Sequence, residues 1–245
     1  MIRQPDDKLA ARFDGQRVVV TGAGRAGQLG EAVARELGKR GAAVALIDRD
    51  SSAVNALAAA LLAEGLDSTP FACDLTDADA TADVAARVAA GAGEVHALAN
   101  VAGGFAMSGP VAESDPLVFR RQLDINLGSA FGATRAFLPH VRRARGAVVF
   151  MASAAVLPGG KVAGMSAYAA AKAGVLAFMR AVAQEERANG VRANALAPTA
   201  IRTSANIEAM GSKFDYVERE TVAAMIVFLC SPLASNISGQ VIELA

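Results

Sequence analysis

The sequence predicts an α/β fold in which seven parallel strands form one doubly wound sheet with helices on both faces. Short β-branched runs alternate with longer helical segments along the whole chain. Hydrophobic residues make up 53% of the chain and charged residues 20%, which suits a sheet that is buried on both faces. Right-handed strand–helix–strand crossovers place helices on both sides of such a sheet. Because no linker rich in Pro, Gly or Ser divides the 245 residues, we expect a single domain over residues 1–245.

Residue patterns give the expected order of strands and helices. The expected strands are Arg17–Thr21, Ala43–Asp48, Ser68–Cys73, Ala97–Asn100, Ala147–Ala152, Val191–Leu196 and Gln240–Glu243. The expected helices are Gly30–Arg40, Ser52–Glu64, Ala78–Ala90, Pro116–Arg143, Ala167–Asn189 and Arg219–Leu229. Residues 1–13 form an N-terminal extension. Residues 199–216 lack clear periodicity and follow the carboxyl end of a strand, where loops line the ligand crevice of α/β sheets, so we expect a substrate-facing loop there.

Charge and composition argue against several classes of partner. The formal net charge is zero, so no long-range field attracts nucleic acid or an anionic membrane. The apolar run at residues 223–230 is too short to span a bilayer, and residues 1–15 lack the apolar stretch of a signal peptide. Cys73 and Cys230 do not have the spacing of metal ligands and suit a reducing compartment. We expect a cytoplasmic protein without a metal, nucleic-acid or membrane partner.

A glycine-rich segment follows the first strand and precedes a helix. Glycines let the backbone turn sharply and approach a pyrophosphate, while the start of the helix offers free N–H groups and a partial positive charge. The position between strand and helix therefore predicts a Rossmann-type dinucleotide site rather than a plain tight turn. The expected cofactor-binding residues of this segment are Gly22, Gly24, Arg25, Gly27, Leu29 and Gly30.

Two carboxylates at strand ends bear on the choice of cofactor. Asp48 closes the second strand, where a carboxylate accepts hydrogen bonds from ribose hydroxyls and repels a 2′-phosphate. We therefore expect NAD(H) to be preferred, although the nearby cations Arg25 and Arg49 leave NADP(H) open and Asp48 is alternatively a helix N-cap. Asp74 either bonds the adenine amino group, with Leu75 near the ring, or caps the next helix.

Tyr168 and Lys172 are four residues apart, so on a helix they share one face. A phenol titrates near 10 and exchanges protons poorly at neutral pH, but a neighbouring ammonium stabilises the phenolate. Lowering the pKa of Tyr168 by ~2–3 units requires about 3–4 kcal/mol of interaction. A phenol tuned in this way would exchange a proton with a carbonyl or an alcohol.

Together these motifs resemble the short-chain dehydrogenase/reductase family, from about Phe13 to the end of the chain. Each motif is weak alone, but their order along the expected elements makes the resemblance specific. The motifs are Thr21-Gly22 with the glycine loop, Asp74, Asn100-Val101-Ala102-Gly103, Asn126, Ser153, Tyr168 with Lys172, and Pro198–Thr203.

The resemblance implies a catalytic role for four residues. Tyr168 would be the general acid/base, and Ser153 would bond the substrate oxygen, unless it is simply a turn residue. Lys172 would hold the nicotinamide ribose and tune Tyr168, while Asn126 would anchor a water that relays protons.

Further cofactor contacts and an assembly also follow from the resemblance. The residues expected near the adenine ribose are Asn100, Ala102 and Gly103, and those expected near the nicotinamide are Tyr168, Lys172, Pro198, Ile201 and Thr203. The nicotinamide itself carries the hydride, so no metal is required. The resemblance also implies a homo-oligomer, a tetramer or dimer, built through residues 116–143 and 167–189.

The chain departs from the family pattern in its glycine loop and at two single positions. The loop from Thr21 to Gly30 is two residues longer than the family's Thr-Gly-x-x-x-Gly-x-Gly, so either Gly24 or Gly27 takes the middle place. Val101 stands where a second Asn is frequent, and Thr199, where Gly is frequent, is expected to reshape the nicotinamide pocket.

The residues expected to face a substrate are mostly apolar. They are Phe105, Leu157, Met165 and Met210, together with the hydroxyl of Ser153. They suggest a small-molecule ketone, 3-oxoacyl compound or secondary alcohol, although several of them alternatively pack the lid. We expect an NAD(H)-dependent oxidoreductase of carbonyls and alcohols. Two alternatives stay open: an NADH-dependent enzyme similar to pteridine reductases, suggested by residues 27–30, and a non-catalytic dinucleotide-binding regulator.

Overall fold

The computed structural model describes residues 11–90 and 93–245. Most of the expected N-terminal extension thus lies outside the described residues. Phe13, at its end, is fully buried in the core, and its backbone N–H donates to the carbonyl oxygen of Arg40 at 2.9 Å. The packed domain therefore includes the chain from Phe13 onward.

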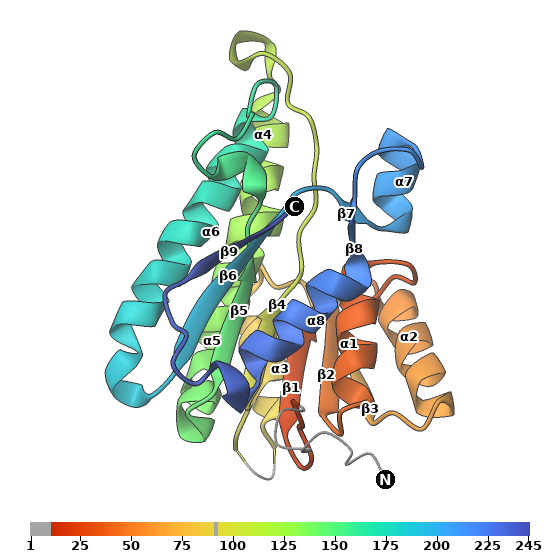
Figure 1. The fold of residues 1–245 in the computed structure, drawn as a ribbon. Coiled ribbons are helices and arrows are strands. Elements are labelled where there is room, and N and C mark those ends of the chain that lie inside the picture. The colour runs from red at the N-terminus through yellow and green to blue at the C-terminus, as the bar shows by residue number, and fades with distance from the viewer. Residues whose placement is uncertain (1–10, 91–92) are drawn as a thin grey trace, which may run out of the picture.

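The described residues contain the expected seven-stranded parallel sheet, in the order β3-β2-β1-β4-β5-β6-β9 (Figure 1). The strands are β1 (Arg17–Thr21), β2 (Ala43–Asp48), β3 (Ser68–Ala72), β4 (Ala97–Asn100), β5 (Ala147–Met151), β6 (Arg192–Pro198) and β9 (Val241–Leu244). Every neighbouring pair is parallel. The order reverses direction between β1 and β4, which is the point where doubly wound sheets bind ligands. The predicted Rossmann-type fold is confirmed.

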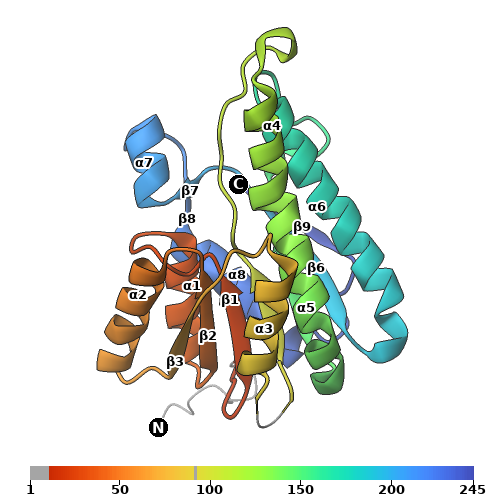
Figure 2. The same cartoon turned by 180° about the vertical axis from the view of Figure 1, so that it is seen from behind.

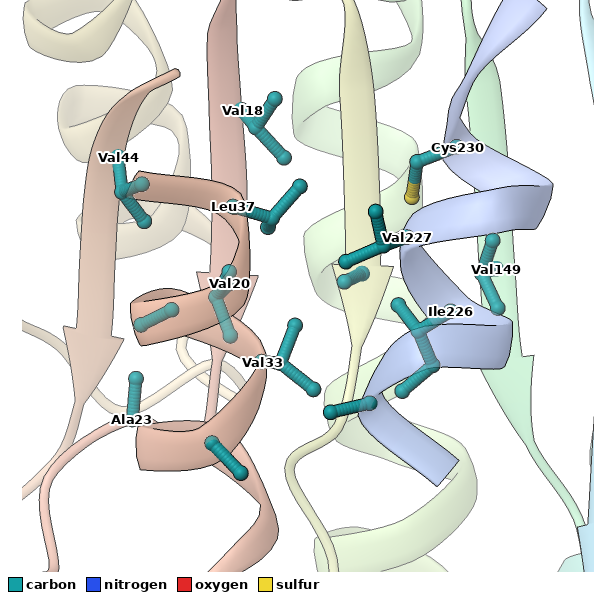
Figure 3. Close-up of a cluster of buried hydrophobic side chains, with 14 of the residues drawn as sticks. Val18, Val20, Ala23, Val33, Leu37, Val44, Val149, Ile226, Val227 and Cys230 are labelled. Atoms are coloured by element: carbon teal, nitrogen blue, oxygen red, sulfur yellow. The ribbon is translucent and has the colours of Figure 1, made fainter. Parts of the chain in front are cut away.

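Helices cover both faces of the sheet, as Figures 1 and 2 show from opposite sides. One face carries α1 (Leu29–Gly38), α2 (Ser51–Ala63) and α8 (Arg219–Cys230), and the other carries α3 (Ala78–Val88), α5 (Ser129–Ala144) and α6 (Ser166–Glu185). Side chains alternate along each strand, so Val18 and Val20 pack under α1 and α8 while Val19 faces the other layer (Figure 3). The two apolar layers hold the strand ends at fixed positions.

The expected continuous helix over residues 116–143 is interrupted. It consists of α4 (Pro116–Leu123), a π turn (Asp124–Gly128) and α5. In the π turn the N–H of Ser129 donates to the carbonyl oxygen of Asp124, five residues earlier. The prediction of one regular helix was wrong here, because helical periodicity continues on both sides of the extra residue. Turns of this type occur frequently at functional sites.

Residues 199–216, which we call the lid segment, are not structureless. They contain β7 (Ile201–Arg202) and α7 (Ser204–Met210), and β7 pairs with β8 (Val217–Glu218) just after the segment. Helix α7 stands apart from the sheet, beyond its carboxyl edge (Figure 1). Every residue of α7 keeps part of its surface exposed, so the sequence carries no periodic apolar face that would have predicted this helix.

Short 3-10 turns complete the chain, at η2 (Val111–Glu113), η4 (Ala154–Val156), η5 (Arg187–Asn189) and η6 (Pro232–Ala234). Within residues 11–90 and 93–245, none of the helices has the length and apolar character needed to cross a bilayer.

Candidate active site

The ends of β1 and β4 are tied together at the switch point of the sheet. The hydroxyl oxygen of Thr21 accepts hydrogen bonds from the N–H groups of Val101 at 3.0 Å and Ala102 at 3.1 Å. The next residue, Gly22, has φ +68°, and a Cβ there would lie 2.7 Å from the Cα of Ala102. Only glycine fits this crossing, so Gly22 and Ala102 meet at the floor of the predicted dinucleotide site.

The glycine loop folds closely onto itself before α1 begins. A Cβ on Gly30 would lie 2.2 Å from the carbonyl oxygen of Gly22, so the first turn of α1 rests directly on the end of β1. Leu29 buries its side chain in the core, which leaves only its backbone for a ligand. The N–H groups of a first helical turn have no partner within the helix, and they carry its positive end. The start of α1 is therefore built as an anion site.

Gly24 and Gly27 both donate their N–H groups to carboxylates. Gly24 donates to Asp48 at 3.0 Å and packs so tightly on it that a Cβ would lie 2.6 Å from the carboxyl carbon. Gly27, with φ +74°, donates to Glu31 at 2.6 Å. The N–H groups of both glycines are therefore engaged within the protein. Arg25 is exposed in the same loop.

The two carboxylates at the strand ends are held by short-range hydrogen bonds. Besides Gly24, Asp48 accepts from the N–H of Asp50 at 3.1 Å, and Asp50 itself caps α2. Asp74 accepts from the N–H of Thr76 at 2.9 Å and from its hydroxyl at 2.7 Å. These bonds, the hydroxyl first, hold the pKa of Asp74 below its usual value. The cap of α3 is Asp77. Both capping alternatives, for Asp48 and for Asp74, are therefore wrong.

Tyr168 lies in the first turn of α6, where the ring of Phe105 packs edge-on against it at 5.0 Å between centroids. Burial raises the pKa of Tyr168, and a hydrogen bond with Ser153 opposes that shift without reversing it. The ammonium of Lys172 is 5.7 Å from the centroid of the Tyr168 ring. The prediction that Lys172 lowers the pKa of Tyr168 was wrong, because burial is the larger influence and raises it, and the opposing contribution comes from Ser153.

Lys172 is buried one helical turn further along α6. Its side chain donates to the carbonyl oxygen of Met151, the last residue of β5, at 2.8 Å. Burial lowers the pKa of Lys172 to about 8. The residue therefore exchanges its proton much closer to neutral pH than an ordinary lysine does.

Asn126 is buried in the π turn and holds the loop that follows β4. Its side-chain amide donates to the carbonyl oxygens of Gly104 at 2.9 Å and Gln122 at 3.0 Å, and its oxygen accepts from the N–H of Gly104 at 3.2 Å. A Cβ on Gly103 would lie 2.7 Å from that oxygen and 3.5 Å from the nitrogen of Lys172. Asn126 and Lys172 thus approach each other around Gly103, which must be small.

Ser153 combines the two interpretations that the sequence left open. It precedes η4, where its hydroxyl accepts from the N–H of Ala155 at 3.3 Å, so it is a turn residue. It is also buried beside the Tyr168 hydroxyl and lowers the pKa of that group. The structure therefore brings together all four predicted catalytic residues, from the turn after β5, from α6 and from the π turn.

Asn100 carries a buried polar atom that lacks a partner. Its amide nitrogen donates to the hydroxyl of Thr134 at 3.0 Å. Its oxygen is buried and has no hydrogen-bond partner among the residues that the structure describes. Unpaired buried acceptors are uncommon in folded proteins, so this one suits a ligand that supplies a donor at the end of β4.

The lid segment begins next to the glycine loop. Pro198 ends β6, and Ile201 follows in β7. Thr203 caps α7 by accepting from the N–H of Asn206 at 3.3 Å. The N–H of Ser204 donates to the carbonyl oxygen of Gly27 at 3.1 Å. The predicted nicotinamide-side residues therefore lie near the loop predicted to bind the phosphates.

The predicted substrate-facing residues are dispersed. Phe105 is half-exposed and packs on Tyr168. Leu157 instead packs against the core layer of α3, α5 and α6, and Met165 is the half-buried residue before α6. Met210 ends α7 and is 39% exposed, on the lid segment rather than in the layer that carries Tyr168.

Sequence reasoning missed several residues that hold the site. Gln122 lies one helical turn before Asn126, a spacing that could have identified it. Glu31 directly follows the last glycine of the loop, which is also a readable signal. Thr134 and Ser204 act through contacts that are distant along the chain and have no local signal. Among the described residues, no group of three or more His, Cys, Asp or Glu side chains is placed to hold a metal ion.

Known proteins are similar to this chain in sequence and in architecture. A family model described as short chain dehydrogenase matches residues 16–212. The chain is 37% identical, over 95% of its length and 93% of the relative, to the (5R,7aS)-5-hydroxy-7a-methyl-1-oxo-2,3,5,6,7,7a-hexahydro-1H-indene-carboxyl-CoA reductase of Mycobacterium tuberculosis. It is 35% identical, over 91% of each chain, to the 2-dehydro-3-deoxy-L-rhamnonate dehydrogenase (NAD(+)) of a Sphingomonas strain.

A solved structure agrees with these sequence matches. The crystal structure of a short-chain dehydrogenase/reductase from Burkholderia xenovorans superposes with a TM-score of 0.84 at 31% identity, over 96% of both chains. The protein therefore belongs to the short-chain dehydrogenase/reductase family and is an oxidoreductase of that family.

Proposed function

We propose that the protein uses NAD(H) to interconvert a carbonyl and a secondary alcohol, with Tyr168 as the general acid/base. The observation that carries the proposal is the convergence of Tyr168, Lys172, Ser153 and Asn126 at the carboxyl edge of the sheet. This arrangement places a half-buried phenol beside a hydroxyl and a buried amine with a pKa of about 8. Such a set is suited to delivering a proton to a substrate oxygen.

A dinucleotide fits the residues around the switch point. The first-turn N–H groups of α1 would hold its phosphates. The tight crossing of Gly22 and Ala102 brings the ends of β1 and β4 together beneath them. The unpaired oxygen of Asn100 would accept a hydrogen bond from it. When bound, a nicotinamide supplies or accepts the hydride.

The protein's own groups handle the proton. Because burial raises the pKa of Tyr168, the phenol keeps its proton at neutral pH. It would donate that proton to the carbonyl oxygen as the hydride arrives and the oxygen becomes basic. Ser153 would hold that oxygen by a hydrogen bond. Lys172, with a pKa of about 8, would replace the lost proton, and Asn126 would hold the adjoining turn in place.

Asp48 supports NAD(H) over NADP(H). Its carboxylate ends β2 beside the glycine loop and is held there by the N–H of Gly24. A negative charge at this position disfavours a 2′-phosphate. One relative, at 35% identity, is named as an NAD(+) dehydrogenase, which agrees with this preference.

The substrate would present an apolar group next to its reacting carbon. Phe105 packs on the Tyr168 ring while half of its surface stays exposed, so it forms an apolar wall beside the phenol. The names of the relatives range from a CoA-ester reductase to a sugar-acid dehydrogenase and do not decide the class. Phe105 favours an apolar ketone or 3-oxoacyl compound over a polyol.

The test is a turnover screen on the purified protein with NADH, NAD⁺, NADPH and NADP⁺. The panel contains ketones, 3-oxoacyl thioesters, secondary alcohols and pterins, and the absorbance of the reduced nicotinamide reports the reaction. Turnover of a carbonyl or alcohol that disappears in Tyr168→Phe supports the proposal. Binding of NADH without turnover of any compound would instead identify a non-catalytic dinucleotide-binding regulator.

We also propose a homo-oligomer built through α4, α5 and α6. Leu117, Phe119 and Phe131 are exposed on these helices, and the ring of Phe131 lies 5.6 Å from that of Phe178 on α6. A contact between copies would remove this apolar surface from water. Light scattering after size exclusion should give a dimer or tetramer for the wild type and a smaller species for Phe131→Asp. A monomeric wild type would contradict the proposal.

The protein would be localised in the cytoplasm. Cys73 and Cys230 are both buried as free thiols, which suits a reducing compartment. Fractionation of cells that express the tagged protein tests this.

A further inference from the structure

The longer glycine loop is fixed at Gly27 from two sides. Its N–H donates to the carboxylate of Glu31 in the first turn of α1, at 2.6 Å. Its carbonyl oxygen accepts from the N–H of Ser204, the first residue of α7, at 3.1 Å. A Cβ on Gly27 would lie 2.0 Å from the hydroxyl oxygen of Ser204, so loop and lid segment touch closely. Gly27 is therefore the point where the extended loop meets the lid.

Glu31 is held in place by cations from two helices. Arg35 donates to it at 3.2 Å from within α1, and Arg219 donates at 3.1 Å from the start of α8. Only 15% of its side chain is exposed. Burial acts to raise the pKa of Glu31, but the Gly27 amide and the two guanidinium groups outweigh it, so the pKa stays below its usual value. The residue is thus a charged acceptor at neutral pH.

The ion pairs do not explain why this acceptor is needed. Arg35 also bonds Glu64, and Arg219 also bonds Glu220 at 2.7 Å, so both cations keep an acidic partner without Glu31. Within the described part of the chain, the donor left without its acceptor would be the Gly27 N–H. The bond specific to Glu31 is therefore the one that shapes the loop.

We infer that Glu31 is a positioning residue for dinucleotide binding, because it holds the two-residue extension of the glycine loop through Gly27 and against the lid segment. The bond from the Gly27 N–H to the Glu31 side chain ties this part of the loop to the first turn of α1. It would thereby fix the loop beside the N–H groups of that turn, which would hold the phosphates. The inference rests on the proposed function, since it assumes that a dinucleotide binds at this loop.

The first experiment compares Glu31→Ala and Glu31→Gln with a matched control, Glu36→Ala. Glu36 lies on the same helix and pairs with Lys39 and Arg40, each at 3.4 Å, but does not contact the loop. The readouts are the Kd for NADH, from a fluorescence titration, and hydrogen exchange of the Gly27 amide in the protein alone. Thermal unfolding of each variant checks that it is folded.

Loss of a hydrogen bond to a charged group should raise the Kd for NADH about tenfold in Glu31→Ala. The Gly27 amide should exchange faster in the same variant. Glu31→Gln, which keeps an acceptor oxygen, should recover part of the affinity, and Glu36→Ala should match the wild type. A folded Glu31→Ala with unchanged Kd and unchanged exchange at Gly27 would overturn the inference. A wild type that binds no dinucleotide would instead overturn the proposed function, while the exchange data would still test the clamp on Gly27.

The second experiment removes the lid side of the contact alone. Ser204 is the first residue of α7, a position that proline tolerates, and Thr203 before it has φ −115° and ψ 158°, which proline also permits. Ser204→Pro deletes the N–H that bonds Gly27, whereas Ser204→Ala keeps it. We expect weaker NADH binding in Ser204→Pro than in Ser204→Ala. Equal Kd values for the two variants would show that the lid does not support the loop.

Discussion

The two halves of the sheet hold their functional side chains in different ways. Around β4, β5 and α6, the key groups are buried and bond to backbone atoms that are distant along the chain, as Lys172 does with Met151 and Asn126 with Gly104. Around β2 and β3, the two carboxylates are more exposed and accept hydrogen bonds from the loops beside them, as Asp74 does from Thr76 and Asp48 from Gly24.

This difference affects how firmly a role can be assigned. A buried lysine without a paired acid is costly, so a structural reason for Lys172 is hard to find and a chemical one is favoured. Asp48 and Asp74 already stabilise their turns by hydrogen bonds, and any cofactor contact would come in addition to those bonds. The catalytic half should therefore respond to substitution with large, specific losses, and the nucleotide half with smaller changes of preference.

The largest effect is expected at Tyr168. Tyr168→Phe removes the proton donor but keeps the ring that packs on Phe105. Turnover should fall by at least about a hundredfold, the usual scale for general acid/base catalysis. NADH binding, measured by titration, should persist. Near-normal turnover in this variant would contradict the proposed mechanism and the contrast between the two halves of the sheet.

Lys172 should leave a signature in the pH dependence of stability. Its pKa of about 8 in the folded protein lies below the 10.5 of an exposed lysine, so between these values the unfolded chain binds the extra proton and stability rises with pH. The free energy of unfolding should gain about 3 kcal/mol across that window, at about 1.4 kcal/mol per pKa unit.

Lys172→Met should lack this gain when both proteins are unfolded with urea at several pH values. Cys230, whose pKa burial raises to about 12, acts in the opposite direction but is present in both proteins, so it cancels in the comparison. Parallel pH profiles for the two proteins would mean that Lys172 is not desolvated as described.

A moderate effect is expected at Asp48. Asp48→Ser removes the charge that disfavours a 2′-phosphate, so the preference for NADH over NADPH should fall about five- to tenfold, the scale of one solvent-screened charge pair. The ratio of kcat/KM values for the two cofactors measures it. Asp50→Ser is the control, since serine also caps a helix and Asp50 is the cap of α2. An unchanged ratio in Asp48→Ser would exclude Asp48 as the selector.

The smallest effect is expected at Phe105. Phe105→Ala removes the apolar wall beside Tyr168 without touching a polar group of the site. The kcat/KM for an apolar cyclic ketone should fall about fivefold, in line with part of a buried phenyl ring, while that for a small polyol should stay level. Equal losses for both substrates would indicate that Phe105 supports Tyr168 rather than selecting the substrate.

Regular elements were predictable from the sequence because their signals are local. Strands such as Arg17–Thr21 and Ala97–Asn100 agree with the structure at both ends, since β-branched and apolar runs are bounded by polar residues and glycine. The four predicted catalytic residues also come together as expected. Because β4 and β5 are neighbouring parallel strands, Asn126, which follows β4, lies near the residues that follow β5.

Other features depend on contacts that no local pattern reveals. The hydrogen bond between Glu31 and Gly27 is supported by Arg219, which is 188 residues away along the chain. Helix α7 has no buried face, so periodicity does not mark it. The raised pKa of Tyr168 reflects how much protein surrounds the ring, and the spacing of Tyr168 and Lys172 says nothing about that.

The π turn at Asp124–Gly128 has a consequence for insertions and deletions. It accommodates one additional residue within a single turn, so the residues of α5 that follow, such as Phe137 and Val141, still point into the core. A chain with one residue fewer there would close an ordinary helix and keep that core, but the wider turn that directs Asn126 toward Gly104 would be lost. At this turn, the additional residue therefore matters for the position of Asn126 and not for the packing of the core.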